Sequence, residues 1–160
     1  MLFRSLIADA AAEGAALVAL PEMFNLFGDR RTLREGAEPL NGPTQTWAAE
    51  QAVAHGIHLL AGSMIEQAGE SRFNTSCLYA PDGTRAATYR KLHLFDVSVP
   101  GAEFSESSTV AAGDELVVAA AGSLTLGLGI CYDLRFPEEF RAQVRRGRSE
   151  EHTSELQSHS

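Results

Sequence analysis

A helix pattern that leads into a wholly apolar run constrains the fold more than any other feature of this sequence. Residues Leu6–Glu13 have helical spacing and are followed by a glycine, which is typical of a helix end. The predicted buried face of this helix carries Leu6, Ala10 and Ala11. The next run, Ala16–Leu20, is apolar at every position, which predicts a strand covered on both faces. A helix and strand joined in this way indicate an α/β fold.

Proline and glycine divide the rest of the chain into further elements. We predict helices over Thr44–His55 and from Pro137 to about Arg146, and strands over Ile57–Glu66 with a break at Gly62, Asn74–Tyr79, Thr84–Leu92, Glu115–Ala120 and Leu124–Ile130. Pro81-Asp82-Gly83 predicts a tight hairpin turn, because Pro presets φ and Gly accepts a positive φ. Loops are expected over residues 25–43, with a helical turn at Arg31–Glu35, and over Val99–Ser108.

Both ends of the chain are predicted to be foreign to the fold. The tail 148–158, RSEEHTSELQS, matches the translation of a common sequencing-library adapter, and the opening LFRS resembles the opposite adapter. We therefore set aside residues 1–5 and 148–160 and assign one domain to residues 6–147. The match also predicts that this domain is an internal piece of a longer one. A polar, disordered tail is the alternative.

Composition and charge exclude several classes of protein. A chain of 160 residues with 44% hydrophobic composition can bury a core, so it is neither fibrous nor disordered. The formal charge of -8 and the scattered arginines argue against a nucleic-acid partner. No apolar run is long enough to span a bilayer and no signal peptide is recognisable, so we expect a cytoplasmic protein without a membrane partner.

The two cysteines lack the close spacing of metal ligands. Cys77 and Cys131 are therefore expected to be reduced thiols, and no metal site is predicted. Cys77 falls inside a predicted strand, where a buried structural thiol is expected. Cys131 instead lies where the apolar run of GLGICYDLRFPE ends, before polar residues and the helix-opening proline. A thiol at the end of a strand is well placed to react.

A second strand end carries a carboxylate. The run Ala16–Leu20 ends at Pro21, which cannot donate to a strand ladder, and Glu22 follows it beside apolar residues. An ionised side chain is costly in such a setting, which favours a functional role. A solvated loop glutamate is the alternative. We expect Glu22 and Cys131 to point to one place.

Lys91, in YRKLHLFD, is the only lysine in the sequence. Arginine supplies every other positive side chain, so a single lysine indicates a position that requires a compact point charge and not a planar fork. Chance remains the alternative explanation.

These three side chains can divide the work of a nucleophilic reaction at a carbonyl carbon. A thiol needs a base to become a nucleophile, the oxyanion needs fixed donors, and an amine leaving group needs a proton. Glu22 can carry protons, while Lys91 and the backbone N–H of Tyr132 can face the oxyanion. A serine-type triad is disfavoured because no histidine is expected at a comparable strand end.

The sequence resembles the nitrilase superfamily of carbon-nitrogen hydrolases over residues 6–147. Four motifs occur in order: LPEMF, YRKLHLFD, PGAEFSES and GLGICYDLRFPE. The resemblance implies that Glu22 is the general base, Lys91 the oxyanion-stabilising cation and Cys131 the nucleophile, and that Glu106 helps to position substrate and lysine. It further implies a partial four-layer α-β-β-α sandwich. No cofactor is implied, and the full-length protein is expected to assemble into a homo-oligomer.

Within that superfamily the motifs look most like the omega-amidase and deaminated-glutathione amidase group. This resemblance implies an amidase that releases ammonia from a small omega-amide through a cysteine thioester. Arg135 is a candidate for binding a substrate carboxylate, with an ion pair to Glu138 or Asp133 as the alternative. Phe27 stands where omega-amidases tend to have tyrosine, which leaves the substrate open. A non-catalytic fragment and an acyltransferase are the alternative functions.

Overall fold

The structure is a computed structural model that describes residues 2–147 and 150–151. Its helices are α1 (Leu2–Ala12), α2 (Arg30–Glu35), α3 (Pro43–His55) and α4 (Pro137–Arg145), with 3-10 turns η1 (Glu106–Ser108) and η2 (Cys131–Arg135). Its strands are β1 (Leu17–Ala19), β2 (His58–Leu60), β3 (Met64–Ala68), β4 (Ser71–Tyr79), β5 (Arg85–Arg90), β6 (Asp96–Val99), β7 (Ala102–Ser105), β8 (Val118–Ala121), β9 (Leu124–Gly127) and β10 (Glu150–Glu151). Helices α1 to α3 and strand β1 come first, six consecutive strands follow, and α4 comes after the β8–β9 pair.

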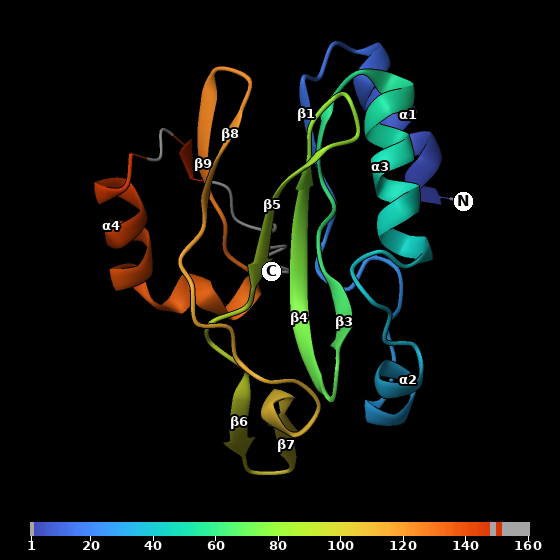
Figure 1. Cartoon of the computed structure of the whole chain (residues 1–160). Coiled ribbons are helices and arrows are strands. Elements are labelled where there is room, and N and C mark those ends of the chain that lie inside the picture. The colour runs from blue at the N-terminus through green and yellow to red at the C-terminus, as the bar shows by residue number, and fades with distance from the viewer. Residues whose placement is uncertain (1, 148–149, 152–160) are drawn as a thin grey trace.

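The elements form four layers that follow one another across Figure 1. Helices α1 and α3 cover one side of the sheet that contains β1 to β5. The β8–β9 hairpin faces the other side of that sheet, and α4 lies beyond the hairpin. The predicted α/β class and the α-β-β-α order of layers are confirmed.

Strand β4 is the centre of the larger sheet. One of its edges pairs with β2 and then with β3, and the other edge pairs with β5, while β1 runs parallel to β2. Gly62 separates β2 from β3: its φ is +40°, and a Cβ there would lie 2.0 Å from the carbonyl oxygen of Pro21. This close approach requires glycine and explains the break that the sequence predicts.

Two apolar cores fill the spaces between the layers. The core between the helices and the larger sheet contains Ile7, Ala48, Ala52, Leu59, Cys77 and Tyr79; the core between the two sheets contains Leu60, Leu78, Tyr89, Ala121, Leu126 and Ile130. Adjacent residues of a strand point to opposite faces, so Cys77 enters one core and Leu78 the other. Wholly apolar runs arise because both faces are buried. Cys77 is a buried thiol, as predicted, and burial raises its pKa to about 11.

The first helix and strand differ from the prediction in two ways. Helix α1 buries Ile7 in the core, with Phe3 and Ala11 packed beside it at four-residue spacing, whereas Leu6 is half exposed. The predicted buried face was therefore misplaced around the helix. Strand β1 lies at the end of its sheet and leaves Ala19 exposed, so it is not covered on both faces.

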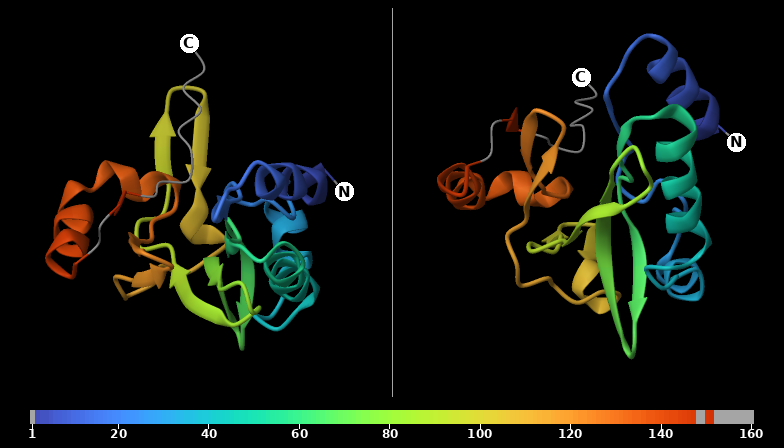
Figure 2. Two further views of the ribbon diagram at one scale, coloured as in Figure 1. Left: turned by 90° about the horizontal axis from the view of Figure 1, so that it is seen from above. Right: turned by 45° about the horizontal axis from the view of Figure 1, so that its top comes forward.

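The segment predicted as a loop over Val99–Ser108 contains a hairpin. Strands β6 and β7 pair from Asp96 with Ser105 to Val99 with Ala102, and η1 follows directly. The hairpin projects away from the layered body, as the left view of Figure 2 shows. Its strands are only four residues long, so Pro100-Gly101 at the turn dominates the sequence pattern and the pairing is missed.

The strand before Cys131 is shorter than predicted. Strand β9 ends at Gly127 and not at Ile130, although Leu128 and Ile130 remain buried. Cys131 therefore begins the 3-10 turn η2 and does not follow the strand directly. The predicted helix after Pro137 is confirmed as α4.

The segments set aside at the two ends are only partly described. Helix α1 begins at Leu2 and so includes residues 2–5, and Glu150–Glu151 pair with β9. Residues 1, 148–149 and 152–160 lie outside the described residues, and the foreign origin of both ends stays a prediction. Across the described ranges, no helix combines the length and apolar character needed to cross a membrane.

Candidate active site

The side chains singled out in the sequence meet at one cavity of about 520 Å³. Glu22 follows β1, Lys91 follows β5, Glu106 begins η1 and Cys131 begins η2, and all four line this cavity. The chain thus brings together four residues separated by up to 109 positions in the sequence. The hydrogen bonds and ion pairs of these four residues indicate what each can do.

Lys91 is held between two carboxylates. Its Nζ lies 3.1 Å from Glu22 Oε1 and 2.9 Å from Glu106 Oε2, and its side chain is 2% exposed. Burial lowers the pKa of Lys91, but the charges and hydrogen bonds of Glu22 and Glu106 outweigh burial, so the pKa lies above its ordinary value. The site therefore contains a permanent, desolvated ammonium group.

Asn74, on β4, is a member of the site that the sequence analysis missed. Its Nδ2 donates to Glu22 Oε1 at 2.8 Å and to Glu106 Oε1 at 3.0 Å, and the residue is fully buried. The amide thus bridges the same two carboxylates that hold Lys91. No sequence signal distinguishes Asn74, because its neighbours Thr75 and Ser76 in β4 are polar as well.

Glu106 is fixed by more than Lys91 and Asn74. The backbone N–H of Phe95 donates to Glu106 Oε2 at 2.7 Å. Tyr132, whose N–H was predicted to face an oxyanion, places its ring in edge contact with Phe95 and Phe136. The oxyanion role of the Tyr132 N–H stays a prediction.

Cys131 is the exposed cysteine, and its thiol opens onto the cavity. Partial burial, the negative charge of Glu22 and a hydrogen bond to Glu22 raise the thiol pKa from 9.0 to about 11, although the charge of Lys91 opposes the shift. The thiol is thus protonated at rest. Attack on a substrate requires a base beside it, and Glu22 occupies that place.

Backbone strain is concentrated at this site. Among the described residues, Met23 (φ +54°) and Cys131 (φ +48°) are the non-glycine residues with a positive φ. Met23 directly follows Glu22, and its N–H donates to Ser63 Oγ at 3.1 Å. Such backbone conformations cost about 1–3 kcal/mol and persist where surrounding contacts hold them. Cys131 and Met23, the two strained residues, both line the cavity.

The cavity walls are mainly apolar. Phe27, which is 89% exposed, Phe95 and Phe104 contribute aromatic side chains, and Arg30 contributes a guanidinium group. Arg135 is exposed on η2 and is not among the described residues that line the cavity.

The alternative partners of Arg135 are engaged elsewhere. Asp133 accepts hydrogen bonds from Tyr89, His93 and the backbone of Ile130, while Glu138 contacts Arg141 at 3.8 Å. A substrate-binding role for Arg135 or Phe27 stays a prediction.

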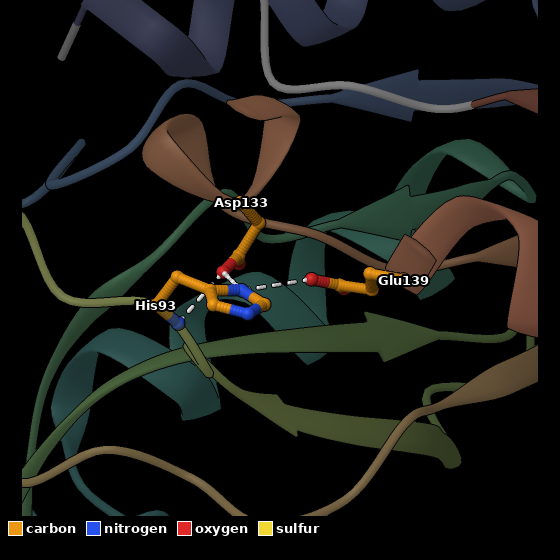
Figure 3. Close-up of side chains that lie close together, drawn as sticks. All are labelled: His93, Asp133 and Glu139. Atoms are coloured by element: carbon orange, nitrogen blue, oxygen red, sulfur yellow. Dashed lines mark hydrogen bonds and ion pairs between the residues drawn. The ribbon is translucent and has the colours of Figure 1, made fainter. Parts of the chain in front are cut away.

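A second polar cluster lies at the 3-10 turn η2. His93 Nδ1 is 2.9 Å from Asp133 Oδ1 and 3.2 Å from Glu139 Oε2 (Figure 3). His93 lies three residues beyond the end of β5 and is not among the described residues that line the cavity. Within the described residues these three form the group that could hold a metal ion, with ligand atoms within 4.8 Å of one another.

The arrangement at the cavity has the parts required for attack on a carbonyl carbon. Cys131 supplies a nucleophilic atom, Glu22 a proton acceptor and Lys91 a buried positive charge. Such a combination can support nucleophilic substitution at a carbonyl carbon. His93, Asp133 and Glu139 are not among the described residues that line the cavity.

Comparison with known proteins specifies the family. The chain belongs to the carbon-nitrogen hydrolase family, whose model matches residues 2–153. It is similar to Omega-amidase NIT2 of Danio rerio (39% identity) and of Homo sapiens (40% identity), over 90% and 89% of this chain. Its structure is similar to that of Saccharomyces cerevisiae Nit3, a member of the nitrilase superfamily, with a TM-score of 0.83 and 27% identity over 95% of this chain and 56% of that one.

The chain spans about half the length of the curated relatives it matches. In both omega-amidases the matched region is 52% of the relative. Membership of the family is shown by these comparisons, and the predicted resemblance is confirmed.

Proposed function

We propose that this chain carries the catalytic site of an amidase that releases ammonia from a small omega-amide through a cysteine thioester. The observation that supports the proposal most directly is the contact of Glu22 with both Lys91 and the Cys131 thiol, at the wall of a single cavity. One carboxylate can then serve the nucleophile and the leaving group in turn.

In the proposed reaction, Glu22 takes the proton of Cys131 and the thiolate attacks the amide carbon. The developing oxyanion faces Lys91 and the Tyr132 N–H. The carbon-nitrogen bond breaks, and the nitrogen leaves as ammonia with the proton held by Glu22. Water then attacks the thioester, gives a proton to Glu22 and releases the carboxylic acid, while the thiol regains that proton. The net reaction consumes one water and needs no redox partner.

The size and lining of the cavity support a small substrate. A volume of about 520 Å³ with phenylalanine walls suits a short carbon chain, and the relatives named as omega-amidases suggest an amide at the end of that chain. A carboxylate at the opposite end of such a substrate would need a positive partner. Arg30, which lines the cavity, is a better placed candidate than Arg135.

Ammonia release from 2-oxoglutaramate tests the proposal. The Cys131→Ala variant should lose at least about 10³-fold of turnover, because the nucleophile is removed. The matched Cys77→Ala variant loses the buried thiol instead and should keep turnover. Absence of ammonia release by the folded wild-type chain, or retention of activity in Cys131→Ala, contradicts an amidase.

A substrate series tests the arginine assignment. Arg30→Gln should raise KM for an omega-amide that carries a carboxylate by about tenfold and leave KM for an uncharged amide unchanged. Arg135→Gln is the comparison variant. If Arg135→Gln has the larger effect on KM, the carboxylate is bound at η2 and the assignment to Arg30 fails.

Hydrolysis and acyl transfer share the thioester and differ in the second nucleophile. Added hydroxylamine traps the acyl group as a hydroxamate, so product analysis in water and in hydroxylamine distinguishes the two reactions. The proposed partner is thus a small-molecule amide. Assembly of the longer protein into a homo-oligomer and a cytoplasmic location stay predictions, the first of which analytical ultracentrifugation measures.

A further inference from the structure

Asp133 is a buried carboxylate with an unusually complete set of hydrogen bonds. Its Oδ2 accepts from the Tyr89 hydroxyl at 2.7 Å and from the Ile130 N–H at 2.8 Å, while Oδ1 accepts from the His93 N–H at 2.9 Å and lies 2.9 Å from His93 Nδ1. The residue is 0% exposed. Several donors around one carboxylate offset the cost of burying its charge.

The donors of Asp133 flank two residues of the cavity in the sequence. Tyr89 and His93 stand two positions before and two positions after Lys91, and Ile130 directly precedes Cys131. Asp133 itself stands two positions after Cys131 in η2. One side chain therefore connects the turn that carries the thiol to the Tyr89 hydroxyl before the cation and to the His93 backbone after it.

The turn needs such a tie because Cys131 has a φ of +48°. A residue with a side chain adopts this conformation at a cost and relaxes when its contacts are lost. The bond from the Ile130 N–H to Asp133 closes the turn around Cys131 from within. A movement of about 1 Å at a nucleophile can cost about 10²-fold in rate.

Glu139 completes the second cluster from α4. Its Oε1 accepts from the Tyr89 hydroxyl and from Gln143 Nε2, each at 3.2 Å, and the Gln143 Nε2 also donates to the Leu128 carbonyl at 2.7 Å. The His93 ring stacks on Phe136 with ring centres 3.6 Å apart. Figure 3 shows the imidazole between the two carboxylates. Glu139 Oε2 lies 3.2 Å from His93 Nδ1 and has no hydrogen-bond partner among the described residues.

We propose that Asp133, with Tyr89 as its buried donor, is a positioning residue that holds the Cys131 thiol against Glu22 and Lys91. Asp133 does not line the cavity, so it acts through the backbone of the turn and of the Lys91 segment. The proposal rests on the proposed function for the meaning of that geometry. Its test uses the chemistry of the thiol and does not require turnover.

The test is the pH dependence of Cys131 alkylation by iodoacetamide, followed by peptide mass spectrometry on the full chain. The surroundings of Cys131 hold its thiol pKa near 11, above the ordinary 9.0. If Tyr89→Phe releases the thiol from Glu22 and the cavity wall, the midpoint of the alkylation profile should fall toward 9. Asp133→Asn should lower it at least as far.

Tyr79→Phe is the matched control. Tyr79 is also a buried tyrosine of the same sheet, and its hydroxyl donates to Gln45 Oε1 at 2.8 Å in the core beneath the helices. Its loss should lower the melting temperature without moving the alkylation midpoint. A purely structural hydroxyl at Tyr89 would behave in the same way.

The outcomes separate the proposals. A midpoint lowered in Tyr89→Phe and unmoved in Tyr79→Phe supports positioning, and an unmoved midpoint in folded Tyr89→Phe overturns it even if Asp133→Asn fails to fold. If the wild-type chain releases no ammonia but Tyr89→Phe shifts the midpoint, the proposed function fails and the positioning role stands.

Discussion

The chain contains two clusters built from the same kinds of groups, a nitrogen base between two carboxylates. Lys91 lies between Glu22 and Glu106, and His93, only two residues further on, lies between Asp133 and Glu139. The first cluster opens onto the cavity and contacts the thiol. The second is closed off by the Phe136 ring and by backbone donors.

The two clusters differ in the hydrogen-bond donors that their carboxylates accept from. Asp133 takes two backbone N–H groups and a tyrosine hydroxyl, which fixes the chain around it. Glu22 takes side-chain donors from Asn74 and Lys91 and keeps a contact with the Cys131 thiol, so it remains available to a reacting group. Similar composition thus gives one cluster that opens onto a cavity and one that is closed off.

Removal of the cation should have the largest effect on the open cluster. Lys91→Met keeps the length of the side chain but leaves two carboxylates facing each other, so we expect turnover to fall about 10³-fold and the free energy of unfolding to fall by about 3 kcal/mol. Ammonia release and urea denaturation measure the two effects.

Arg90→Met is the control for that variant. Arg90 pairs with the buried Glu66 at 2.6 Å and lies outside the cavity, so its loss should reduce stability and leave turnover within about twofold. Equal losses of turnover in the two variants would remove the distinction between the open cluster and an ordinary buried ion pair.

Removal of the base should change thiol reactivity and catalysis in opposite directions. The charge of Glu22 raises the pKa of Cys131, so Glu22→Gln should lower that pKa and make alkylation at pH 8 about tenfold faster. Turnover should nevertheless fall at least about 10²-fold, because no group remains to move the proton. Iodoacetamide kinetics and ammonia release measure these two changes.

Glu103→Gln provides the comparison for the alkylation result. Glu103 lines the same cavity and is not among the groups that shift the thiol pKa, so alkylation should keep its wild-type rate. Faster alkylation in Glu103→Gln would assign the effect to the overall field of the cavity and not to contact with Glu22.

The Glu139 carboxyl of the closed cluster should make the stability of the chain depend on pH. Burial and the charge of Asp133 raise the pKa of Glu139 from 4.5 to about 7, so its contribution to stability is full below about pH 4.5 and is lost as pH rises through 7. The wild-type chain should lose about 3 kcal/mol from this group over that range. Glu139→Gln, which stays neutral, should lack this loss.

Chemical denaturation between pH 4.5 and 8 measures this slope. Glu138→Gln is the neighbouring control, because Glu138 is exposed and contacts Arg141 at 3.8 Å. The slope should match wild type in Glu138→Gln and be smaller in Glu139→Gln. Equal slopes in all three proteins would show that the Glu139 carboxyl does not titrate as a buried group.

The residue patterns by themselves determined the α/β class and the reactive groups, while the order of the layers was implied by the family resemblance. The apolar run Leu124–Ile130 predicts a buried segment, and its alternate residues Leu126, Leu128 and Ile130 do enter the core. The single lysine and the thiol and carboxylate after apolar runs identify Lys91, Cys131 and Glu22, because ionisable groups at such places are costly without a partner.

Only the tertiary structure decided how those groups are held. Asn74, Asp133 and Glu139 acquire their contacts from elements distant in the sequence: Asn74 from the segments after β1 and β7, and Asp133 and Glu139 from the end of β5. Sequence patterns report which side chains are buried but not which donors meet them. Glu139 illustrates the limit, because its place in the first turn of α4 suggests a solvent-exposed charge, whereas packing against Tyr89 and His93 buries it.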